Sequence, residues 1–180
     1  MNKESYFTEK ELNNIFEDGF IYELNMVVFT LIRFMHYLNK PYRTIEEKQE
    51  QDVFLESFLI HTRVIIDFFR FNKNYPNNVY YTYYVGKGSV INLVDTEEEL
   101  FRDLSTKLAH ITRGRLQDNI KWGDRLEEIK NCILGLLKQF EKIIADSERK
   151  KLLSEKIKEI EIIEIKEKSF INSGATGPRY

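Results

Sequence analysis

Two segments rich in histidine and arginine hold the side chains best suited to chemistry. In one of them, Arg102, Thr106 and His110 follow one another at intervals of four residues, and Arg113 lies three residues further on. Side chains spaced by three or four residues lie on the same side of a helix. Histidine exchanges protons near neutral pH, whereas arginine keeps its positive charge and binds phosphate through two hydrogen bonds. This combination suits RNA cleavage without a metal ion, with His110 as acid or base and Arg102 or Arg113 at the phosphate.

The other polar strip lies on an earlier segment that is otherwise apolar. Glu56, Arg63, Asp67 and Arg70 occur at intervals of seven, four and three residues, so one side of a helix carries them all. Arg63 and Asp67 are four residues apart and can form an ion pair. Together with His61 they are candidates for a polar cluster that contacts phosphate. The alternative interpretation is that both strips are solvated helix faces with surface ion pairs.

Neither a metal ion nor a cofactor is expected. The histidines His36, His61 and His110 fall on three different predicted helices, and no Glu-x-x-His pair of the kind found in helical-bundle metal sites occurs. Cys132 lies beside the apolar stripe of its predicted helix, which indicates a buried structural thiol rather than a nucleophile.

The composition is typical of a globular protein that carries no strong overall charge. Of its 180 residues, 42% are hydrophobic and 31% are charged, which is enough apolar material for one packed core. The formal net charge of -2 predicts no overall attraction to nucleic acid or to an anionic membrane, so any RNA contact must be local. The single cysteine and the polar start of the chain favour a cytoplasmic location. The apolar stretches fall short of the ~20 residues that cross a bilayer, so no membrane association is expected.

The spacing of apolar residues predicts the helices that must position these side chains. We expect them at 20–39 after a weaker turn at 8–16, and at 44–71, 96–114, 123–145 and 148–168. Capping residues mark two helix starts, at Thr44 with Glu47 and at Thr96 with Glu99. The β-branched residues of 160–165 are compatible with helix and with extended chain. The sequence therefore predicts an all-α, antiparallel bundle of four to five helices in one domain, 1–168, with a flexible tail at 169–180.

Two of the segments carry further expectations. The helix at 44–71 is apolar on most of its circumference, which is typical of a central helix. The long connection at 72–95 carries Tyr80, Tyr81, Tyr83 and Tyr84, with a short extended piece expected at 79–85. Exposed tyrosines suit a docking surface, and the alternative is that these rings cover the end of the bundle.

The stretches LIHTRVIIDFF (59–69) and TKLAHIT (106–112) resemble HEPN-like helical-bundle proteins of bacteria and archaea, over about 20–145. The resemblance implies a four-helix-type bundle, a homodimer and, in active members, metal-independent ribonuclease activity of the toxin or antiviral type. The family motif is an arginine, four to six residues and a histidine. His110 matches the histidine, and Arg102 precedes it with seven residues between them. Members with a degraded motif are binding or assembly modules, so the alternative is a non-catalytic helical module that dimerises or docks a partner.

Overall fold

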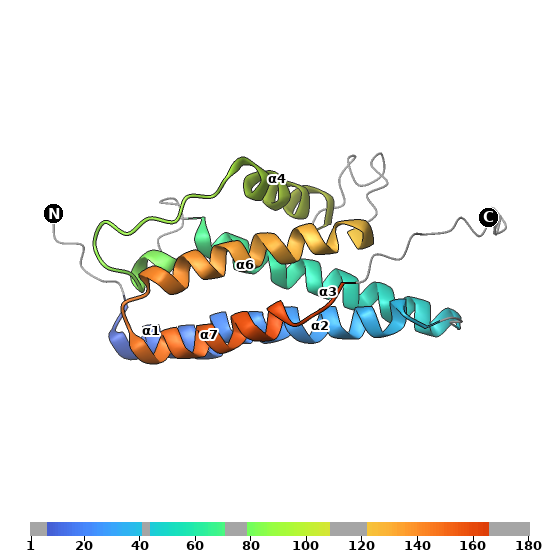
Figure 1. Ribbon diagram of the computed structural model, residues 1–180, viewed down its shortest axis with the longest axis horizontal. Coiled ribbons are helices and arrows are strands. Elements are labelled where there is room, and N and C mark those ends of the chain that lie inside the picture. Colours follow the sequence, from blue (N-terminus) through green and yellow to red (C-terminus); the bar gives the residue numbers. More distant parts are fainter. Residues whose placement is uncertain (1–6, 41–43, 71–78, 109–121, 166–180) are drawn as a thin grey trace.

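The computed structural model describes residues 7–40, 44–70, 79–108 and 122–165, with only the backbone of 107 and 108 (Figure 1). Within these ranges the chain is helical and contains no β-strand, only an isolated antiparallel bridge between Val85 and Ile144. The predicted all-α bundle is confirmed. The helices are α1 (Glu9–Asn14), α2 (Tyr22–Leu38), α3 (Ile45–Phe69), α4 (Asp95–Asp103), α6 (Leu126–Ile143) and α7 (Ser147–Glu161), with π-helical segments η1 (Ile15–Ile21) and η3 (Leu104–Leu108) and 3-10 turns η2 (Tyr81–Tyr83) and η4 (Trp122–Arg125).

The helical turn predicted at 8–16 is present, and it is part of a longer element than expected. Thr8 and Glu11 form a capping box, in which the Thr8 backbone N–H donates to Glu11 Oε2 at 2.7 Å and the Glu11 N–H donates to Thr8 Oγ1 at 3.2 Å. The hydrogen bonds from Thr8 lower the pKa of Glu11. From this start the chain continues through η1 into α2, so the predicted weak turn at 8–16 and the helix at 20–39 are one continuous element.

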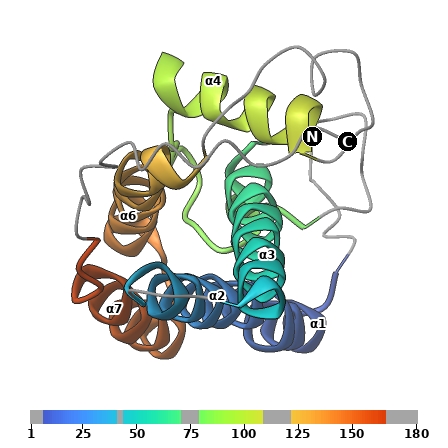
Figure 2. The same ribbon diagram turned by 90° about the vertical axis from the view of Figure 1, so that its right-hand side faces the viewer.

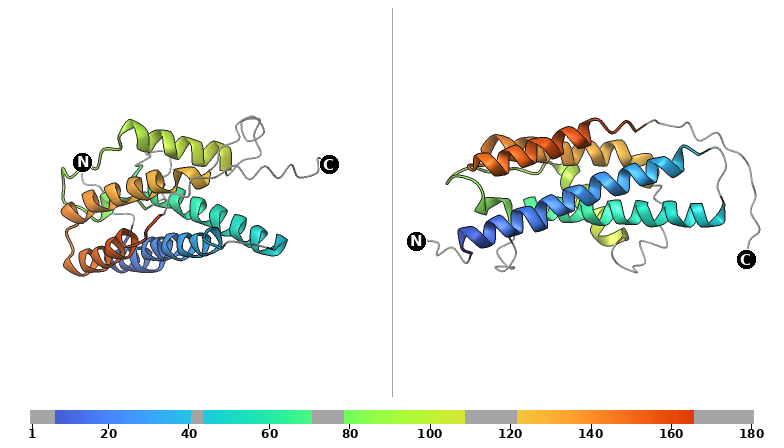
Figure 3. Two further views of the ribbon diagram at one scale, coloured as in Figure 1. Left: turned by 45° about the vertical axis from the view of Figure 1, so that its right-hand side comes forward. Right: turned by 90° about the horizontal axis from the view of Figure 1, so that it is seen from below.

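α2 and α3 form an antiparallel helical hairpin. The predicted capping box of Thr44 and Glu47 is present, and α3 then runs for 25 residues. Two contacts show the opposite directions of the helices. Tyr22 at the start of α2 packs against His61 in the second half of α3, and Lys40 after the end of α2 pairs with Glu47 at the start of α3 at 2.6 Å. The far end of this hairpin extends beyond α6 and α7 (Figures 1 and 3). Part of both helices therefore lies outside the main bundle.

The core lies where α2, α3, α6 and α7 surround a common axis, and α4 lies across the top of α3 and α6 (Figure 2). Phe140 of α6 is fully buried and has ring contacts with Phe20, Phe68 and Phe69 at centroid distances of 5.6 to 5.9 Å. Apolar stripes at helical spacing produce this core, as the sequence predicts. Among the described residues no helix is long and apolar enough to span a membrane.

The tyrosine segment closes one end of the core and does not offer an exposed surface. Tyr80, Tyr81 and Tyr84 are 3%, 4% and 2% exposed. The Tyr84 hydroxyl donates to the Leu12 carbonyl at 3.1 Å, and the Ile91 N–H donates to the Tyr81 hydroxyl at 3.0 Å. The prediction of an aromatic docking loop is therefore wrong, and the alternative, that the rings cover the end of the bundle, is correct. The segment forms the 3-10 turn η2 where an extended piece was expected.

Three predicted helix boundaries also differ from the structure. α4 begins at Asp95 and not after a Thr96 cap, because Glu97 reaches back to accept the Val94 N–H at 2.7 Å. The fourth predicted helix starts as the 3-10 turn η4 and is α-helical only from Leu126. α7 ends at Glu161, and 163–165 are neither helical nor part of a strand. The predicted end of the third helix at Gly114 and the tail at 169–180 lie outside the described residues.

Candidate functional site

Arg70, at the C-terminal end of the polar strip of α3, joins α3 to α4. The Arg70 guanidinium donates to Glu98 Oε2, with Nε and Nη2 each 3.1 Å from it. The guanidinium carbon also lies 3.7 Å from the centroid of the Phe101 ring, which is a close cation–π contact. Arg70 is therefore engaged within the fold, and it fixes the start of α4 against the end of α3.

Asp67 is the titratable group of this strip whose environment is most unusual. It is half-buried, and burial raises the pKa of its carboxyl, while the nearby charges of Arg70 and Arg63 lower it. The predicted ion pair between Asp67 and Arg63 is not among the ion pairs of the described residues, and Arg63 acts on Asp67 only through its nearby charge. A carboxyl with a raised pKa beside two guanidinium groups is the kind of group found both in functional sites and in structural ion-pair networks.

Two hydroxyl groups in the same region have no hydrogen-bond partner, among the residues described. They are Thr62 Oγ1 on the fully buried side of α3 and Ser105 Oγ on η3. α4 and η3 run antiparallel to α3 (Figure 1), and η3 packs against α3. A buried hydroxyl without a partner costs about 1–3 kcal/mol. Sequence reasoning missed this pair, although a threonine within an apolar run is a visible signal.

Of the three residues of the third predicted helix expected to cleave RNA, Arg102, His110 and Arg113, the structure describes only Arg102. Its side chain is exposed on α4, and its carbonyl accepts a hydrogen bond from the Thr106 hydroxyl at 2.7 Å. His110 and Arg113 lie outside the described residues, so their placement beside Arg102 or Arg63 stays a prediction. What the structure brings together is the helix that carries Arg63 and the segment η3, which precedes His110 in the chain.

The positive charges around α4 are largely matched by carboxylates. Arg125 at the start of α6 pairs with Asp103 at 2.9 Å and with Glu128 at 2.8 Å. With Arg70 bound to Glu98, two guanidinium groups of this region are already in ion pairs. The described part of the strip therefore presents little unmatched positive charge to a phosphate.

His61 lies on a different side of α3 from Arg63 and Asp67. Its Nδ1 is 2.6 Å from Glu23 Oε2 of α2, and the two side chains are 16% and 21% exposed. The edge of the Tyr22 ring packs against the imidazole. Side chains two residues apart on a helix point about 200° apart, which explains why His61 does not join the predicted cluster.

Beside this pair, α2 and α3 expose apolar side chains on the side away from the core. Tyr22 and Phe29 of α2 are each 49% exposed, and Val53, Ile60 and Val64 of α3 are 62%, 49% and 43% exposed. We call these five residues the outer face. Contact between Phe29 and Phe54, with centroids 6.0 Å apart, joins its two halves. α3 is the central helix that its sequence predicts, in contact with α2, α4 and α6, but on this side no described element packs over it.

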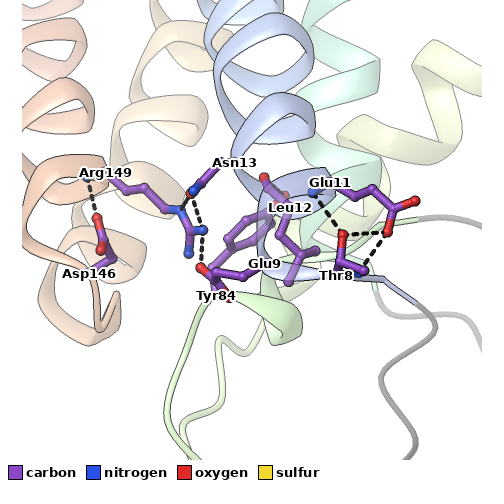
Figure 4. Close-up of polar contacts among 8 residues, drawn as sticks. All are labelled: Thr8, Glu9, Glu11, Leu12, Asn13, Tyr84, Asp146 and Arg149. Atoms are coloured by element: carbon purple, nitrogen blue, oxygen red, sulfur yellow. Dashed lines mark hydrogen bonds and ion pairs between the residues drawn. The ribbon is translucent and has the colours of Figure 1, made fainter.

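A third polar cluster, at the other end of the bundle, is structural (Figure 4). The side chain of Arg149 is 8% exposed, its Nε donates to Asn13 Oδ1 at 3.0 Å, and its Nη2 also binds Glu9. The guanidinium lies 5.1 Å from the centroid of the Tyr84 ring, and burial raises the pKa of Tyr84 to about 12. These contacts join α7, α1 and η2 and occupy the arginine. No spacing in the sequence predicted them.

Within the described residues, no group of three or more His, Cys, Asp or Glu side chains is placed to hold a metal ion. No protein-family model matches the chain, and it matches neither a curated protein nor a solved structure. The resemblance to HEPN-like proteins therefore stays a prediction, and the function must be argued from the arrangement of the side chains.

Proposed function

We propose that this protein is a helical interaction module that binds a partner protein through the outer face of α2 and α3. The observation that carries the proposal is the outer face itself, five apolar side chains that are 43% to 62% exposed on two adjacent helices. Single exposed apolar residues are ordinary, but a contiguous group is typical of an interaction surface. Two of the five are aromatic, a type enriched at the centre of protein interfaces.

The helices that display this face are held rigidly. The rings of Tyr37 and Phe54 stack between α2 and α3, and the Arg33 guanidinium covers both, at 5.8 Å and 5.4 Å from their centroids. The Tyr37 hydroxyl also donates to Glu50. A rigid surface loses little conformational entropy when a partner binds, so more of the contact energy appears as affinity.

Site-specific photocrosslinking tests this proposal. A photoreactive phenylalanine analogue replaces Phe29 in cells that naturally make the protein, and a matched protein carries it at Lys150, which is exposed on α7. We expect a covalent adduct of one defined mass from position 29 and none from position 150. Equal labelling at both positions, or no adduct at position 29, would refute the proposal.

A second candidate function follows from the resemblance. It is metal-independent cleavage of RNA, of the toxin or antiviral type, by a homodimer in which His110 acts as acid or base and Arg102, Arg113 or Arg63 contacts phosphate. The observation that favours it is the packing of η3 against α3, the helix of Arg63. Folded wild-type protein is then expected to cleave RNA in EDTA, and His110→Ala to remove this activity without a change in melting temperature. Intact RNA with wild-type protein would exclude this function.

A further inference from the structure

The charges around the outer face are distributed unevenly. On the α3 side, Glu46, Asp52 and Glu56 are exposed. Their positions keep these three side chains on the same side of a 3.6-residue helix as Ile60. We call this group the acidic edge. It lies along the N-terminal half of α3, whereas towards the C-terminal end Asp67 is half-buried near the charges of Arg63 and Arg70.

The α2 side of the outer face is different in character. Its exposed residues include Asn25 and Ile32, and Ile32 is 50% exposed. Arg33 and His36 are also exposed there, and the Arg33 guanidinium lies over the rings of Tyr37 and Phe54. A partner therefore meets an apolar strip with a negative border on the α3 side, whereas the α2 side exposes no acidic side chain.

From these borders we propose that the outer face binds a basic amphipathic helix of a partner protein. This inference rests on the proposed function and names the class of partner. An apolar strip formed by two adjacent helices accepts the apolar side of a third helix, which anchors through its residues i, i+3, i+4 and i+7. Lysine and arginine residues flanking those anchors then lie along the acidic edge. Val53 to Val64 spans 11 residues, which is about 16 Å of helix, so the bound helix needs about three turns.

Other occupants fit the charges less well. A second copy of this chain brings the same acidic edge and a formal net charge of -2. RNA and anionic lipid surfaces are negatively charged, and the acidic edge repels them. A cationic flank is the feature that turns the acidic edge from a repulsive border into an attractive one.

Binding of two synthetic peptides tests the inference. One is a fluorescent helical peptide of about 18 residues with leucine on one side and lysine on the other, and its partner has glutamate in place of every lysine. Anisotropy is measured with wild-type protein, with the double variant D52K/E56K, with F29E, and with the control E148K/E155K. The control makes the same change in charge at two exposed positions of α7, which lies on the other side of the bundle from the exposed side of α3 (Figure 2).

We expect the lysine peptide to bind the wild-type protein, and the glutamate peptide to bind at least about tenfold more weakly. Reversing two exposed charges in D52K/E56K is expected to weaken the lysine peptide by about tenfold, since each exposed pair contributes up to about 1 kcal/mol. F29E is expected to remove binding, and E148K/E155K to leave it within about twofold of wild type. Circular dichroism confirms that each variant is folded.

Each contrary result has a distinct meaning. Equal binding of both peptides, or equal loss in D52K/E56K and E148K/E155K, would overturn the inference. So would a wild-type dimer that F29E converts to a monomer, because a second copy then occupies the outer face. If the lysine peptide does not bind while position 29 still gives a crosslinked partner, the basic helix is rejected and the proposed function stands. If the crosslink is also absent, both are rejected.

Discussion

Neighbouring residues of α3 offer a direct measurement of whether the outer face is open. Leu59 is 1% exposed and Ile60 is 49% exposed, although both are large, apolar and in the same turn. Leu59→Ala leaves a cavity in the core and is expected to lower the free energy of unfolding by about 3 kcal/mol. Ile60→Ala leaves no cavity. It removes three side-chain carbons that are already about half exposed to water, which lowers the free energy of unfolding by about 1.2 kcal/mol. The higher helix propensity of alanine reduces this loss to about 0.8 kcal/mol.

Urea unfolding followed by circular dichroism at the helix band measures both values. We expect the same denaturant slope for wild type and both variants, and a shift in midpoint about three to four times larger for Leu59→Ala than for Ile60→Ala. An equal shift would show that Ile60 is covered in the folded protein at the concentration used. A tenfold dilution then separates self-association, which weakens on dilution, from packing within one chain, which does not. Packing within one chain would refute the outer face.

Three further predictions concern single side chains. Arg149→Ala is expected to lower the free energy of unfolding by about 2–3 kcal/mol, because it removes the hydrogen bonds to Asn13 and the contact with the Tyr84 ring. Glu9→Gln is expected to lower it by less than about 0.5 kcal/mol, because Glu9 is 72% exposed. Urea unfolding that ranks the two variants in the reverse order would contradict a structural role of the Arg149 cluster. Burial raises the pKa of Asp67 in the folded state, so the stability that it contributes is complete below its unfolded pKa and is lost as pH rises through the folded value. Wild type should therefore lose stability relative to Asp67→Asn as the pH rises above the pKa of an ordinary aspartate, about 3.9, and a constant difference would argue against the raised pKa. Burial raises the pKa of Cys132 from 9.0 to about 12, which lowers the thiolate fraction at pH 8 about a thousandfold. Alkylation of Cys132 by iodoacetamide at pH 8 should therefore be about a thousandfold slower in folded than in unfolded protein. Similar rates in the two states would show an accessible thiolate.

The local signals in the sequence were sufficient for the helices and for much of the core. The capping box at Thr44 and the apolar spacing of α6 predicted those elements, because both depend on residues within one or two turns of each other. The N-terminus of α4 was predicted two residues too late. There, Glu97 and not Glu99 accepts the backbone N–H at the start of the helix, and in a run of three glutamates the spacing does not distinguish between them.

The candidate sites show where sequence reasoning failed. The spacing of Arg63, Asp67 and Arg70 predicted one strip, but not that Glu98 would bind Arg70. His61 was grouped with Arg63 because they are close in sequence, yet α2 supplies its carboxylate from 38 positions away. The tyrosines of η2 appeared suited to an exposed surface, and only their contacts with α1 and α6 show that they are buried.

The sequence by itself determined that the chain forms amphipathic helices with a common apolar core, since helical periodicity and capping are properties of neighbouring residues. The tertiary structure decided which apolar side of α3 is covered and which remains open. α3 carries large apolar side chains on its core side and on its outer side, so its own residues do not distinguish Leu59 from Ile60. The difference arises because the other helices pack against one side only, and the position of each helix depends on contacts between residues far apart in the chain.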